Sequence, residues 1–357
     1  MSTYNNKFKI GNKYIGDRFP TYFIADIASN HDQNLNRAKD LIYLAKEAGA
    51  DAVKLQHFEA STLVSDTEFR SLKLKSHQSK WKKSVYETYK QNELLFEWTE
   101  ELYKISKKIK IDFFTAAYSE NLVDRVNRFI PAYKIGSGDI TYSDILKNIA
   151  KKNKPIFLAT GAASAQEVDL AVKTIRKKNK KLCLMQCNTN YTGSKKNLNF
   201  INLNVLNYYK KKYNLIIGLS DHTHGHTTVL GAVALGARAV EKHFTDNNSR
   251  IGPDHSFSMN KNTWSDMVQA TRELESSLGS GVKKIEENEK VTSILQRRSI
   301  ILSKNINKDS KISKSDLVFL RPNVPGGFQP YEASKVIGKI INKKKKRGQA
   351  LLKKDIK

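Results

Sequence analysis

Short apolar runs of strand length recur along the chain, and each is followed by a segment whose apolar positions repeat at helical spacing. The runs are Phe23–Ala28, Ala52–Phe58, Ile111–Ala117, Ala132–Gly138, Pro155–Gly161, Leu182–Asn188, Ile216–His222 and Ala239–Thr245. The clearest helical patterns cover Leu35–Ala48, Ser164–Lys177 and Lys261–Leu278, and Gly49 and Gly236 follow predicted helices, where glycine commonly ends them. This repetition predicts an α/β fold, a (β/α)8 TIM barrel, with a doubly wound open sheet as the alternative. The number of repeats and the polar residues that end the strands favour the barrel.

Three segments do not fit the repeat. Residues 8–15 alternate around Gly11-Asn12, which predicts a hairpin that closes the bottom of the barrel. Residues 59–93 are too many for a simple connection, so we expect a loop beside the active face. The composition changes after Gly281, and we predict a barrel domain over 1–280, a linker over 281–294 and a small β-rich domain over 295–357.

The formal net charge of +27 raises the possibility of a nucleic-acid-binding protein. The basic residues occur in short lysine clusters, such as residues 210–212 and 343–347, without interleaved aromatic side chains. This arrangement is more typical of a solvated lysine-rich surface, so nucleic-acid binding is kept as the non-enzyme alternative.

The sequence predicts a cytoplasmic protein with free thiols. No apolar run is long enough to span a membrane, and the first nine residues lack the apolar region of a signal peptide. Cys183 and Cys187 fall four residues apart in one predicted strand, which places them about 13 Å apart, too far for a disulfide.

Two histidines end neighbouring predicted strands at matched positions, His222 after Ile216–Asp221 and His243 after Ala239–Lys242. In a parallel barrel both imidazoles would project from the same rim. No cysteine or third histidine is placed to complete a closed zinc site, so we predict a divalent metal with open positions, Mn²⁺ or a similar ion.

Lysines inside apolar strands indicate an anion site on the same rim. Lys54 and Lys134 lie within the second and fourth runs, where an unpaired charge is costly. They could bind a phosphate or carboxylate, or form buried pairs with Asp26 or Asp139. We favour the anion site because several polar side chains converge there.

At this point the residues resemble a known family, the sialic acid synthases. The resemblance runs from residue 23 to residue 357. It rests on the motifs Ile24–His31, Ala48–Gln56, Tyr133–Gly138, Gly218–Thr223, Glu241–Phe244, Leu320–Pro322 and Val336–Lys339. It implies a TIM barrel with a C-terminal antifreeze-like (SAF) domain. It also implies a transferase that condenses phosphoenolpyruvate with a mannosamine-type sugar to give a nonulosonic acid and phosphate.

The resemblance assigns roles residue by residue. His222 and His243 would hold Mn²⁺, with Mg²⁺ or Co²⁺ as alternatives, so that the sugar aldehyde is polarised. Phosphoenolpyruvate would be bound by Lys54, Gln56, Lys134, Ser137 and Ser220. The sugar would contact Tyr191, Asn190, Asp254 and Arg321, with Arg321 supplied by the partner subunit of a domain-swapped homodimer. Asp26 and Asp139 would stabilise developing positive charge and transfer protons, although many members carry Glu at both positions.

The acceptor sugar stays open. N-acetylmannosamine, a diamino sugar leading to a pseudaminic- or legionaminic-type acid, and the acceptor for another 3-deoxy sugar acid are all compatible with these motifs.

Overall fold

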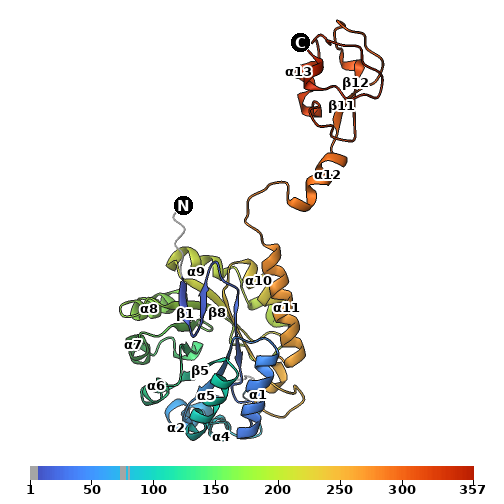
Figure 1. Cartoon of the computed structure of the whole chain (residues 1–357). Coiled ribbons are helices and arrows are strands. Elements are labelled where there is room, and N and C mark those ends of the chain that lie inside the picture. Colours follow the sequence, from blue (N-terminus) through green and yellow to red (C-terminus); the bar gives the residue numbers. More distant parts are fainter. Residues whose placement is uncertain (1–6, 73–77, 79–80) are drawn as a thin grey trace. The chain divides into compact units, whose positions relative to one another are not determined.

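The computed structural model describes residues 7–72, 78 and 81–357. It separates into two compact units, Met1–Gly279 and Ser280–Lys357, which are described in turn (Figure 1). No helix in the described ranges is long and apolar enough to cross a membrane.

A closed parallel barrel forms the centre of the first unit, so the open-sheet alternative is wrong. Each strand pairs with the next along the chain, and the last pairs with the first. The barrel strands are β3 Tyr22–Asp26, β4 Ala52–His57, β5 Asp112–Ala117, β6 Tyr133–Ile135, β7 Ile156–Ala159, β8 Leu182–Cys187, β9 Ile216–Asp221 and β10 Ala239–His243. Both cysteines are free and buried in β8, as predicted.

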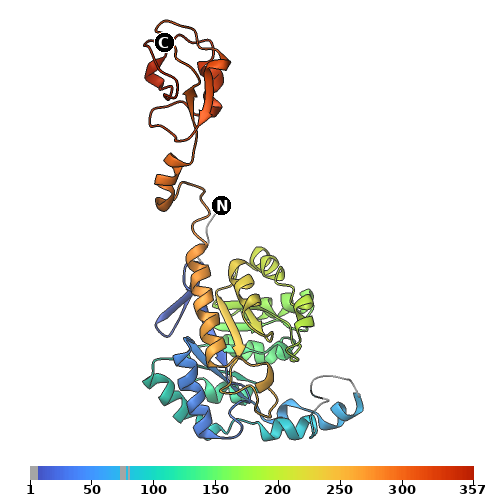
Figure 2. The same ribbon diagram turned by 90° about the vertical axis from the view of Figure 1, so that its right-hand side faces the viewer.

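Helices surround the barrel, and at least one follows each strand (Figures 1 and 2). They are α1 Leu35–Glu47, α5 Thr99–Lys108, α6 Glu120–Val126, α7 Ser143–Lys151, α8 Ala165–Arg176, α9 Val205–Tyr213, α10 Thr227–Ala234 and α11 Lys261–Ser277. Ser164 caps α8 in a reciprocal capping box with Glu167. Gly49 and Gly236 follow α1 and α10 with φ of 91° and 98°, the left-handed conformation that favours glycine.

The predicted hairpin is present and closes the barrel bottom. Strand β1 Lys7–Ile10 pairs antiparallel with β2 Lys13–Gly16. Phe8, Ile10 and Ile15 are buried in one cluster with the inward side chains of the barrel strands, among them Phe157. The rings of Phe8 and Phe157 meet edge to face, with centroids 6.0 Å apart. The bottom of the barrel is therefore filled with apolar side chains.

The second unit is small and built around one buried apolar cluster. Strand β11 Ser299–Leu302 pairs antiparallel with β12 Leu317–Leu320, and α13 Ala333–Val336 packs nearby. Inside the unit, Lys345 Nζ lies 2.5 Å from Asp355 Oδ2. The segment predicted as a linker, residues 281–294, overlaps helix α12 Lys290–Leu295, which has no buried residue.

Candidate active site at the strand ends

Alternation along the last two strands decides which side chains face the barrel interior. Ser220 of β9 and Glu241 of β10 are hydrogen bonded to each other, with Oγ and Oε1 3.2 Å apart. Asp221 and Lys242 point the other way, toward α10, where their carboxylate and amine lie 2.5 Å apart. Thr228 of α10 also donates to Asp221. This ion pair is buried between the barrel strands and α10, with both side chains 1% exposed. Asp221 and Lys242 therefore do not face the site.

The two predicted histidines do lie together on the rim. The ring centroids of His222 and His243 are 5.3 Å apart, and the Tyr191 ring lies 4.2 Å from His222. His222 Nδ1 lies 2.8 Å from the Asn188 carbonyl oxygen, so Nδ1 donates and Nε2 is left as a possible metal ligand. Burial lowers the pKa of His243 to about 3, so this ring is neutral, and its buried Nδ1 has no hydrogen-bond partner among the described residues.

The donor set fits a metal ion with open positions. One ring nitrogen of each histidine can face an ion, and Asp254 Oδ2 lies 4.0 Å from His243 Nδ1. The described part of the chain contains no group of three or more His, Cys, Asp or Glu side chains arranged to hold a metal. The pair therefore suits an ion that takes its other ligands from substrate or water, and it does not form a closed structural site.

Lys54 is buried beside a carboxylate. Its Nζ lies 2.7 Å from Asp26 Oδ2, with the two side chains 3% and 2% exposed. Burial opposes the charge on Lys54, but Asp26 and Glu241 outweigh burial and raise its pKa. The same Asp26 oxygen accepts a hydrogen bond from Gln56 Nε2 at 3.3 Å and lies 3.6 Å from His243 Nε2. The pair of Lys54 with Asp26, one of the two alternatives considered from the sequence, is thus present.

Lys134 also has a carboxylate partner, but it is Glu241 and not Asp139. Lys134 Nζ lies 3.3 Å from Glu241 Oε1, and both side chains are buried. Glu241 Oε2 is buried without a hydrogen-bond partner among the described residues. No role for Glu241 follows from the sequence, because a single sequence does not indicate which strands face each other across the barrel.

Asp139 and Ser137 lie on a short 3-10 helix, Ser137–Asp139, that follows β6. Burial raises the pKa of Asp139 to about 6, although nearby Lys134 acts in the opposite direction. Ser137 Oγ accepts a hydrogen bond from the Gly161 N–H at 2.9 Å. A Cβ at Gly161 would stand 2.5 Å from the Thr189 methyl group, so glycine is required for this close approach.

A cavity of about 400 Å³ opens above these groups. Of the predicted residues, Gln56, Ser137, Asp139, Tyr191, His243 and Asp254 line the cavity. Asp26, Lys54, Lys134, Ser220 and His222 are buried on the same rim. Asn190 is exposed and bonded within its own loop to Thr192 and Asn197, so the structure does not place it in the cavity. Arg321 belongs to the second unit and is exposed there.

The long connection after β4 supplies one wall of the cavity, as its predicted place beside the active face requires. It contains α2 Ala60–Leu63, α3 Asp66–Leu72 and α4 Val85–Gln91. Trp81 and Tyr89 from this segment line the cavity with Phe58, whose ring centroid is 5.4 Å from that of Tyr89. The sequence does not predict these aromatic residues in the cavity, because apolar positions in this segment do not repeat at the spacing of a strand or a helix.

Comparison with known proteins identifies the family. Residues 41–283 match the model of the NeuB family, and residues 297–357 match that of the SAF domain. The chain belongs to the NeuB family. Its relatives include the N,N'-diacetyllegionaminic acid synthase of Legionella pneumophila, 35% identical with 96% of each chain covered. The pseudaminic acid synthase of Campylobacter jejuni is 32% identical, with 92% of this chain and 95% of that protein covered.

Among solved structures, the chain is similar to the N-acetylneuraminic acid (sialic acid) synthetase of Leptospira borgpetersenii, which was determined in complex with citrate. The TM-score is 0.72 at 27% identity, with 81% of this chain and 95% of that one covered. The TIM barrel and SAF domain expected from the sequence are therefore confirmed for this NeuB-family chain.

Proposed function

We propose that this NeuB-family protein condenses phosphoenolpyruvate with an open-chain N-acylated mannosamine-type sugar, releasing phosphate and forming a nonulosonic acid. The observation that supports this most directly is the convergence of two buried lysines, a histidine pair and four carboxylates on one rim beside the cavity. The three relatives described above are named as acid synthases or synthetases, which supports the same reaction class.

The lysines would hold the anionic substrate. Lys54 and Lys134 would bind the carboxylate and phosphate of phosphoenolpyruvate, with hydrogen bonds from Gln56, Ser137 and Ser220. C3 of phosphoenolpyruvate then bonds to the aldehyde carbon of the sugar, the aldehyde oxygen takes a proton, and positive charge develops at C2. Water adds at C2 and loses a proton, and cleavage of the C–O bond expels phosphate to leave the keto acid.

Asp26 and Asp139 would act while C2 carries positive charge. An ionised carboxylate near C2 stabilises this charge and can accept the proton of the attacking water. Asp26 is held by Lys54 and Gln56, so its orientation is fixed. Asp139 lines the cavity with a pKa of about 6, which suits a group that exchanges a proton near neutral pH.

His222 and His243 would hold the divalent cation, for which we propose Mn²⁺. When bound, such an ion polarises a carbonyl group as a Lewis acid. His243 is neutral, and His222 uses Nδ1 for its hydrogen bond to the Asn188 carbonyl oxygen. Each residue therefore keeps a ring nitrogen that can coordinate the ion.

A second candidate acceptor is a diacylamino sugar. The relative at 35% identity is named as a synthase of N,N'-diacetyllegionaminic acid, a product with two acetylated nitrogens, which supports an acceptor with two acylamino groups. The aromatic side chains of Phe58, Trp81 and Tyr89 offer apolar surface for acyl methyl groups.

We also propose that the active protein is a domain-swapped homodimer in which Arg321 of the SAF domain contacts the sugar bound to the partner barrel. Mixing inactive His222→Ala with inactive Arg321→Ala subunits tests this arrangement. A swapped dimer regains one complete site in every mixed dimer, whereas subunits that work alone regain no activity.

The deciding experiment for the reaction is phosphate release from phosphoenolpyruvate with a panel of hexosamines carrying one or two acylamino groups, with and without Mn²⁺. His222→Ala should abolish turnover and weaken Mn²⁺ binding measured by calorimetry. Full activity after chelation, or in His222→Ala, would show that the metal assignment is wrong.

A further inference from the structure

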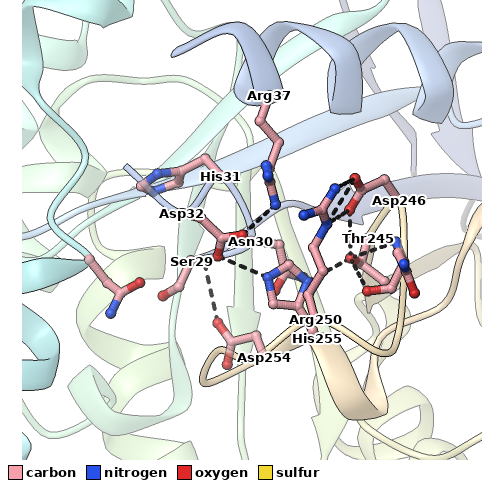
Figure 3. Close-up of polar contacts among 12 residues, drawn as sticks. Ser29, Asn30, His31, Asp32, Arg37, Thr245, Asp246, Arg250, Asp254 and His255 are labelled. Carbon is pink, nitrogen blue, oxygen red and sulfur yellow. Dashed lines mark hydrogen bonds and ion pairs between the residues drawn. The ribbon is translucent and has the colours of Figure 1, made fainter. Parts of the chain in front are cut away.

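Two loops meet at the mouth of the cavity, and a network of buried and half-buried polar side chains joins them (Figure 3). One follows β3 and carries Ser29, and the other follows β10 and carries Asp254; both residues line the cavity. The Ser29 N–H donates to Asp254 Oδ2 at 3.2 Å. Asn30 Nδ2 donates to the Phe244 carbonyl and to Ser258 Oγ, each at 2.9 Å. The position of the Asp254 carboxylate therefore depends on how the two loops are held together.

His255, next to Asp254, is the centre of this network. Its ring is 0% exposed, with Nε2 2.9 Å from Asp32 Oδ1 and Nδ1 2.7 Å from Thr245 Oγ1. Asp32 Oδ2 is paired with Arg37 Nη1 at 2.5 Å, which holds the carboxylate as an acceptor. Nε2–H therefore donates to Asp32, and the imidazole bridges the first loop to the second.

Local backbone geometry explains why such a bridge is needed. In the first loop Ala28, Asp32 and Gln33 all have positive φ, at 45°, 47° and 53°, a conformation that side chains with a Cβ adopt at a cost. In the second loop a Cβ at Gly252 would stand 2.7 Å from the His255 ring, so glycine makes room for the imidazole. Both loops are thus shaped around His255, although it does not line the cavity.

We propose that His255 is a positioning residue, which through its hydrogen bond to Asp32 fixes the Asp254 carboxylate at the cavity. This inference rests on the proposed function and on the sugar contact that the family resemblance implies for Asp254. It assigns a task to two residues, His255 and Asp32, that do not line the cavity.

A double-mutant cycle tests the proposal with phosphate release as the assay. His255→Leu should lower kcat/KM about 10- to 100-fold, mainly through a higher KM for the sugar, with the KM for phosphoenolpyruvate unchanged. Combined with Asp254→Asn, the same change should cost less than about threefold, because the group that it positions is already lost. His255→Gln, whose amide can still donate to Asp32, should recover most of the activity.

A matched control removes an ion pair between the two helices that follow these loops. Glu47→Gln removes the exposed ion pair of Glu47 with Lys261, which joins α1 to α11 at 2.6 Å, and should leave both KM values unchanged. If His255→Leu does not fold, Asp32→Ala removes the bridge from its other end. Effects of His255→Leu and Asp254→Asn that multiply in the double variant would overturn the proposal.

Crystal structures of the single variants separate failure of this proposal from failure of the proposed function. Wild-type protein that releases no phosphate with any acceptor would refute the function alone. The positioning role would then be judged by whether the Asp254 carboxylate leaves the Ser29 N–H in His255→Leu. An Asp254 that stays in place would overturn the proposal whatever the activity.

Discussion

Replacing Asp139 by Asn should make the protein less active and, above pH 6, more stable. Burial raises the pKa of this carboxyl from its ordinary 3.8 to about 6, so the ionised form is disfavoured in the folded state. Below pH 3.8 the group is protonated in both states. As the pH rises from 3.8 through 6 the wild type loses stability, because the unfolded chain releases the proton more readily, and above about pH 6 the loss is complete. Asn carries no proton to lose, so the variant escapes this penalty.

The size of the effect follows from the two pKa values. A pKa that rises from 3.8 to about 6 corresponds to about 3 kcal/mol at high pH, at 1.36 kcal/mol for each pH unit. By the same linkage about half of this is already present at pH 5, so the advantage of Asp139→Asn should grow by about 1.4 kcal/mol from pH 5 to pH 8. Partial exposure of the carboxyl reduces this to about 1 kcal/mol, or a relative gain of about 2–4 °C in Tm.

Thermal unfolding at pH 5 and pH 8, with pH profiles of kcat/KM, measures both effects. Wild-type kcat/KM should fall about tenfold per pH unit below pH 6, and the variant should lack this step and lose at least about 100-fold in rate. Asp144→Asn, which changes a carboxylate 66% exposed on α7, is the control and should show no pH-dependent gain. The reasoning is refuted if the stability difference between Asp139→Asn and wild type is the same at both pH values.

Three further changes probe the barrel. Lys54→Met should destabilise the protein by about 3–5 kcal/mol in urea unfolding, because it leaves the Asp26 carboxylate buried without its cation, and it should raise the KM for phosphoenolpyruvate. A smaller loss with an unchanged KM would mean that the pair is not important for either property. Gly218→Ala would place a Cβ 2.7 Å from the Ala239 carbonyl oxygen, and we expect a loss of about 1–3 kcal/mol in unfolding free energy. His243→Gln should weaken Mn²⁺ binding in calorimetry at least tenfold, whereas unchanged binding would exclude this ring as a ligand.

The barrel could be predicted because its signal is repetitive. Every strand is an apolar run with a helix after it, and closure of the sheet then places all carboxyl ends on one rim. His222 and His243 could be predicted on this rim because each lies at the carboxyl end of an apolar run of strand length. The wall that contains Trp81 and Tyr89 could not be found, because it comes from a connection whose path depends on tertiary packing.

Contacts between side chains of strands that are not neighbours in the sheet also could not be predicted from the sequence. Glu241 lies on β10 and Lys134 on β6, and these strands do not share a ladder in the barrel. Their contact across the interior depends on strand tilt and side-chain length, neither of which appears in a single sequence. Lys54 and Asp26 could be considered as a pair because β3 and β4 are consecutive strands, and their Cα atoms are directly opposite.

The charges on the rim predict that binding of phosphoenolpyruvate depends on binding of the divalent cation. Two lysines, Lys54 and Lys134, face the four carboxylates of Asp26, Asp139, Glu241 and Asp254, so the ionised site carries two negative charges in excess. A doubly anionic rim would repel phosphoenolpyruvate. A divalent cation between His222 and His243 would cancel this excess, and protonation of Asp139 below pH 6 would cancel part of it. It follows that phosphoenolpyruvate and the divalent cation should bind with positive coupling, which titration of one in the presence and absence of the other measures directly. Independent binding would mean that the paired lysines already neutralise the carboxylates that face the substrate.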